Sequence, residues 1–74
     1  METIMKNFKY DPEETVRWEG VGDLTLRTAV KRIMASPPEN RVLVRMYRDA
    51  GKDPPSLMQE EVEWLAEQPE FKAG

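Results

Sequence analysis

The chain has 74 residues, of which 39% are hydrophobic and 34% charged, and it contains neither histidine nor cysteine. A chain of this length forms one small domain. The lack of cysteine excludes disulfides, thiol nucleophiles and thiolate metal sites, and the lack of histidine excludes imidazole bases and imidazole metal ligands.

The charge is distributed unevenly along the chain. Residues 1–23 carry a net charge of −3, residues 24–52 carry +5, and residues 53–74 carry −5, which gives −3 for the whole chain. A negative chain is not typical of nucleic-acid binders. No apolar run is long enough to span a bilayer, and no cysteine indicates an oxidising compartment, so we expect a cytoplasmic protein that does not enter a membrane.

Residues 1–23 allow two local structures. Apolar and polar side chains alternate on both sides of Asp11-Pro12-Glu13-Glu14, which is typical of two short strands around a turn. Alternatively, Asp11 is an N-cap, Pro12 follows it at the first helical position, and Glu14 completes a capping box. We favour the capped turn, because an isolated two-stranded hairpin is marginally stable in water. In both cases Phe8, Tyr10, Val16 and Trp18 are expected to cover one end of the core.

The first predicted helix covers residues 24–35, with Asp23 as its N-cap. Its apolar positions repeat every three to four residues and form one face, which consists of Leu26, Ala29, Val30, Ile33 and Met34.

The second predicted helix covers residues 37–50. The sequence Ser36-Pro37-Pro38-Glu39 is a typical helix start, and Gly51 is well placed as a left-handed C-terminal cap. At helical spacing, the core face consists of Leu43, Met46, Tyr47 and Ala50, with Val42 alongside. A stripe of cations lies on the opposite side and consists of Arg41, Arg45, Arg48 and Lys52.

The third predicted helix covers residues 56–68, with Ser56 as its cap and Gln59 in the capping-box position. Its inner face consists of Met58, Val62, Leu65 and Ala66, and its outer face carries an acidic stripe of Glu60, Glu63 and Glu67. Phe71 follows Pro69 and is expected to fold back onto the domain.

These elements predict a mainly α fold. We expect an extended or turn-containing segment over residues 1–23 that packs on a small three-helix domain over residues 24–74, in a single domain overall. The predicted core consists of Leu26, Val30, Ile33, Met34, Leu43, Met46, Tyr47, Val62 and Leu65.

Two groups of residues are candidates for binding. The cation stripe of Arg41, Arg45, Arg48 and Lys52 suits an anion, although a charged stripe is also the ordinary solvated face of a surface helix. A second group, Leu57, Trp64 and Phe71, suits a protein partner, although a chain this small also needs large apolar groups for its core.

No residue pattern predicts catalysis, a cofactor or a metal. The paired carboxylates, such as Glu60 and Glu61, lack a concave and partly dry setting, and no calcium-loop spacing occurs. We therefore expect a small non-catalytic protein-interaction module or regulator, of the kind that bacteria or phages encode. The alternative is a nucleic-acid-binding protein that uses the cation stripe. Self-association, with the cation stripe of one chain against the acidic stripe of another, is compatible with both.

Overall fold

The computed structural model describes residues 9–52 and 54–72 of the chain. Within these residues the strands are β1 (Thr15–Trp18), β2 (Gly22–Thr25), β3 (Met46–Tyr47) and β4 (Ser56–Leu57). The helices are α1 (Leu26–Met34), α2 (Pro38–Arg41), α3 (Gln59–Ala66) and α4 (Pro69–Lys72).

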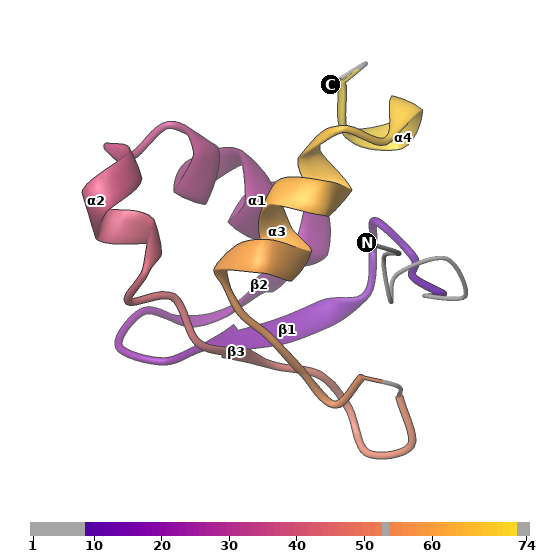
Figure 1. The fold of residues 1–74 in the computed structure, drawn as a ribbon. Coiled ribbons are helices and arrows are strands. Elements are labelled where there is room, and N and C mark those ends of the chain that lie inside the picture. Colours follow the sequence, from indigo (N-terminus) through magenta and orange to yellow (C-terminus); the bar gives the residue numbers. More distant parts are fainter. Residues whose placement is uncertain (1–8, 53, 73–74) are drawn as a thin grey trace.

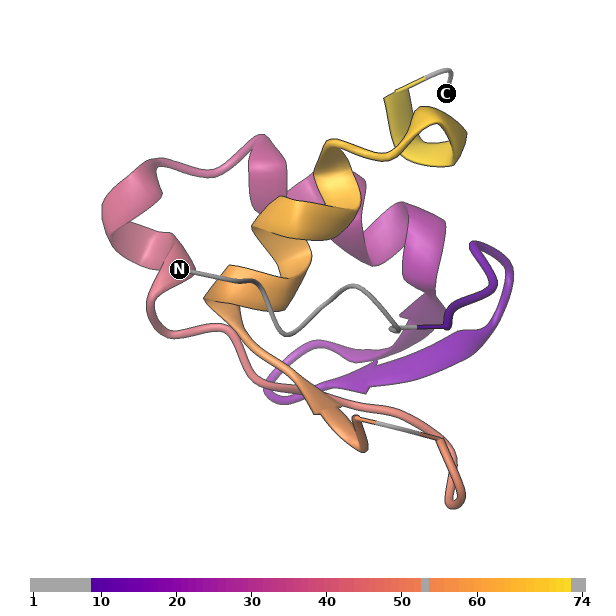
Figure 2. The same cartoon turned by 45° about the vertical axis from the view of Figure 1, so that its right-hand side comes forward.

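The strands form an antiparallel sheet in the order β2-β1-β3-β4. Helices α1 and α3 pack against each other on one face of this sheet (Figures 1 and 2). The domain is therefore α+β, and the predicted mainly α three-helix bundle is wrong. An antiparallel sheet needs only one covered face, and two short helices are enough to cover it here.

The principal error concerns residues 37–50. A helix does begin after Ser36, but α2 ends at Arg41, and the chain then becomes extended. From residue 44 to residue 48 the side chains alternate between the core and the surface, which is the period of a strand. Met46 and Tyr47 pair with Trp18 and Arg17 of β1. Met46 faces the core under helical and strand spacing alike, so its position could not distinguish the two.

The N-terminal turn has the predicted capped form. The Glu13 amide donates to Asp11 Oδ1 at 2.9 Å, and the Asp11 amide donates to Glu14 Oε2 at 3.1 Å. No helix follows this turn, because the chain enters β1 at Thr15 and pairs with β2. The pairing of residues 8–10 with 16–18 is not formed at Lys9 and Tyr10, which are not in a strand, and Phe8 lies outside the described residues.

Both longer helices occur where the periodicity predicts them, but they begin later. The N-cap of α1 is Thr25, whose hydroxyl accepts from the Thr28 amide at 3.2 Å, whereas Asp23 belongs to β2. The N-cap of α3 is Met58, whose amide donates to Glu61 at 2.8 Å. The capping-box geometry therefore exists two residues beyond the predicted position, because Ser56 is used in β4.

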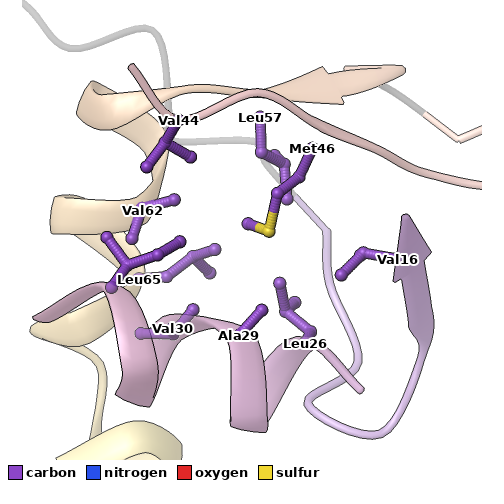
Figure 3. Close-up of a cluster of buried hydrophobic side chains, with 10 residues drawn as sticks. Val16, Leu26, Ala29, Val30, Val44, Met46, Leu57, Val62 and Leu65 are labelled. Carbon is purple, nitrogen blue, oxygen red and sulfur yellow. The ribbon is translucent and has the colours of Figure 1, made fainter. Parts of the chain in front are cut away.

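The core lies between the sheet and helices α1 and α3 (Figure 3). Six of the predicted core residues are buried, namely Leu26, Val30, Ile33, Met46, Val62 and Leu65. Met34 and Trp18 are half-buried against this core. The prediction is wrong for Leu43 and Tyr47, which are exposed because the extended segment over residues 44–48 directs Val44 and Met46 inward instead. It is also wrong for Val42 and Ala50, which were expected on the same face and are exposed. The remaining core residues are Val16, Ala29, Val44 and Leu57.

Candidate functional site

The predicted cation stripe does not form one surface, because its residues are not on one helix. Arg48 belongs to the inward side of the extended segment, and its side chain is 1% exposed. Its Nε and Nη2 donate to the two carboxylate oxygens of Glu14 at 3.1 and 3.0 Å, and Glu14 is itself 7% exposed. The same guanidinium donates to the carbonyls of Lys9 at 2.8 Å and Pro54 at 3.1 Å. Arg48 therefore fastens the N-terminal turn to the β3–β4 hairpin.

Arg41 is also turned toward the protein. Its Nη2 donates to the carbonyls of Met34 and Ser36 at 3.1 and 3.2 Å, and its Nη1 lies 3.6 Å from a carboxylate oxygen of Glu63. A helix leaves its last carbonyls without intrahelical partners, and Arg41 satisfies one of these at the end of α1. Arg45 is exposed and Lys52 half-buried.

The predicted aromatic patch is divided in a similar way. Leu57 is fully buried in the core, whereas Trp64 and Phe71 are half-buried. Trp64 and Phe71 both pack against Tyr10, whose ring centroid lies 5.9 Å from that of Trp64 and 5.7 Å from that of Phe71. Tyr10 was missing from the predicted patch, because its sequence separation from both partners gives no local signal.

Tyr10 also fixes α4 through its hydroxyl, which donates to Glu70 Oε1 at 2.8 Å. Burial, and then the hydrogen bond and the charge of Glu70, raise the pKa of Tyr10 above its ordinary value of 10.0. The aromatic cluster is therefore an anchor for the two ends of the described chain rather than an open apolar patch.

An apolar surface that the sequence did not predict lies at the turn after α2. Leu43 is 76% exposed and Val42 is 63% exposed, and we call these two residues the apolar tip. The tip lies between the end of α2 at Arg41 and the buried Val44. The only sequence signal for an extended segment here is the short alternation of apolar and charged residues in Val44-Arg45-Met46.

The sheet face opposite the helices carries a broad open hollow of about 590 Å³. Its lining includes Arg17, Asp23, Tyr47 and Asp49. Arg17 and Asp23 form an ion pair at 3.3 Å in which both side chains are largely exposed. Cations and carboxylates balance on this face, so it has no clear preference for an anion.

The described residues contain no group of three or more carboxylates placed to hold a metal ion. None of the helices in that part of the chain combines the length and the apolar character that a bilayer crossing requires. Comparison of the chain with protein-family models, with curated proteins and with solved structures finds no match.

Proposed function

We propose that this chain is a small non-catalytic protein-interaction module and that it contacts its partner through the apolar tip. The observation that supports this proposal is the exposure of Leu43 and Val42 side by side at 76% and 63%. Single exposed apolar residues are common on protein surfaces, whereas contiguous exposed apolar patches mark interaction sites.

The energetics of a small domain strengthen this interpretation. Burying one leucine contributes roughly 1.5–3 kcal/mol, and a domain of this size has a limited core. Leu43 contributes little of this to folding, because most of its surface remains in water. When a partner covers the Leu43 side chain, its burial contributes a free energy of this size to binding.

The tip is also held in place before a partner arrives. The Leu43 amide donates to the Asn40 carbonyl at 3.2 Å, and the Val44 amide donates to the Arg41 carbonyl at 3.2 Å. Val44 is buried on one side of the tip, and Arg41 is fixed to the end of α1 on the other. A surface that is ordered in advance loses less conformational entropy on binding.

The test compares Leu43→Ser with Val21→Ser. Val21 is a matched control, because it is also an exposed apolar residue but lies in the turn between β1 and β2. Each tagged variant and the unmodified chain are expressed in the source cell, and captured proteins are quantified by mass spectrometry. We expect a protein that is captured by the unmodified chain and by Val21→Ser but lost with Leu43→Ser.

Binding of that protein is then measured with purified components. A set of captured proteins that is identical for Leu43→Ser and Val21→Ser would contradict the proposal. Nucleic-acid binding is the competing outcome, and a complex in a low-salt mobility-shift assay that Arg45→Glu abolishes would favour it.

A further inference from the structure

A second surface lies on another part of the molecule, where α1 meets the C-terminal end of the described chain. A hollow of about 300 Å³ opens between α1, the end of α3 and α4. Its apolar lining consists of Val30 and Met34 from α1, Ala66 from α3, and Phe71 from α4. The charged side chains around this lining are those of Arg27, Lys31 and Glu67.

The walls of this hollow are fastened to one another. Arg27 Nη1 donates to the Glu70 carbonyl at 2.9 Å, which ties α1 to α4. Phe71 contacts the ring of Tyr10, which limits its freedom to fill the hollow. The hollow is therefore a preformed feature, and a ligand would not need to create it.

The charge around the hollow is positive on the α1 side. Helix α1 contains no acidic residue, and Lys31 forms no ion pair with any residue that the structure describes. Arg27 pairs with Glu13 at 2.9 Å, and Glu67 on the opposite side pairs with Lys72 at 3.7 Å. Lys31 is thus the rim charge that is available to an incoming carboxylate.

We propose that the hollow binds a segment of a partner protein in which a large apolar side chain is flanked by acidic residues. The apolar side chain would occupy the hollow, and a neighbouring carboxylate would pair with Lys31. A volume of about 300 Å³ is at the lower end for ligand pockets, which suits one anchoring side chain better than a whole cofactor. The proposal uses a different surface from the apolar tip, so each can fail without the other.

The test is an NMR titration of the ¹⁵N-labelled full chain with three blocked hexapeptides. The peptide EELFEE has the anchor and the acidic flanks, KKLFKK reverses the flanking charge, and EESSEE lacks the anchor. We expect saturable shifts of the Val30, Lys31, Met34 and Ala66 amide signals with EELFEE alone, at a Kd on the order of 1 mM or below.

Charge dependence is tested with Lys31→Glu and with the matched control Arg32→Glu. Both residues are exposed and adjacent on α1, but only Lys31 lines the hollow. We expect Lys31→Glu to weaken EELFEE binding about fivefold and Arg32→Glu to change it less than twofold. Unchanged one-dimensional spectra of both variants would show that they fold.

Several results would overturn this proposal. These are the absence of saturable shifts with EELFEE, equal binding of KKLFKK, and equal effects of the two variants. Saturable binding of octanoate without binding of EELFEE would assign the hollow to a small amphipathic acid instead. Concentration-dependent shifts of the same amides without peptide would assign it to a second copy of the chain.

Discussion

The ion pair between Arg48 and Glu14 is predicted to hold a large share of the folding free energy. Removing one member of a buried ion pair costs about 3–5 kcal/mol, because the other charge is left without compensation. In Arg48→Met the nearly buried Glu14 carboxylate loses both contacts to the guanidinium, and the carbonyls of Lys9 and Pro54 lose a donor. A domain of this length has a total stability of roughly 4–11 kcal/mol. Arg48→Met should therefore lower the free energy of unfolding by about 3–5 kcal/mol.

The measurement is urea unfolding followed by tryptophan fluorescence, with Arg45→Met as the matched control. Arg45 is close in sequence but exposed, so its replacement should change the free energy of unfolding by no more than about 0.5 kcal/mol. If Arg48→Met is too unstable to measure, Glu14→Gln removes the same charge pair and keeps the side-chain shape. Equal effects of Arg48→Met and Arg45→Met would refute the assignment of Arg48 to the interior.

A double-mutant cycle with Arg48→Met and Glu14→Gln checks the pairing itself. The doubly substituted chain should lose less stability than the two single losses combined, because the second substitution removes the charge that the first left uncompensated. Strict additivity would show that the two side chains do not interact in solution.

The remaining predictions concern burial, a turn and a titration. Leu57→Ala should destabilise the fold by about 2–5 kcal/mol and Leu43→Ala by no more than about 0.5 kcal/mol in the same urea assay, because the first side chain is enclosed and the second is in water. Gly51→Ala should cost about 1 kcal/mol, since the φ of Gly51 is +92° and a Cβ disfavours that conformation; no loss of stability would contradict this backbone geometry. In Tyr47→Phe the absorbance near 295 nm should report the ionisation of Tyr10 alone, and its midpoint should lie above pH 10.0. Because folding favours the neutral form of Tyr10, its contribution to stability is complete below about pH 10 and is lost as the pH rises through the raised pKa. A midpoint at or below 10.0 would contradict the partly buried position of Tyr10 beside Glu70.

Local signals in the sequence predicted local structure correctly. The Asp11–Glu14 turn and the central turns of α1 and α3 depend on contacts between residues no more than four positions apart. The residue types at such short spacings are sufficient to predict these contacts. Gly51 was also identified as a left-handed position, although it serves the turn between β3 and β4 and does not end a helix.

The candidate binding residues were less predictable, because their exposure depends on which element carries them. On a helix, Arg48 would face solvent and Leu43 the core, whereas on the extended chain that follows α2 the two exchange environments. Tyr10 joins Trp64 and Phe71 only because α4 returns to the N-terminal segment.

The sequence by itself determined the chain's small size, its charge distribution, its helical faces and its turns. Tertiary structure decided that residues 44–48 are extended, because the β1–β2 hairpin offers an edge where β3 can form hydrogen bonds. That pairing joins residues far apart in the chain, so its free energy depends on the whole fold. The spacing of apolar residues within 44–48 therefore gives only a weak indication of a strand. Once β3 is in place, it directs Met46 and Val44 into the core, encloses Arg48, and leaves Leu43 in water.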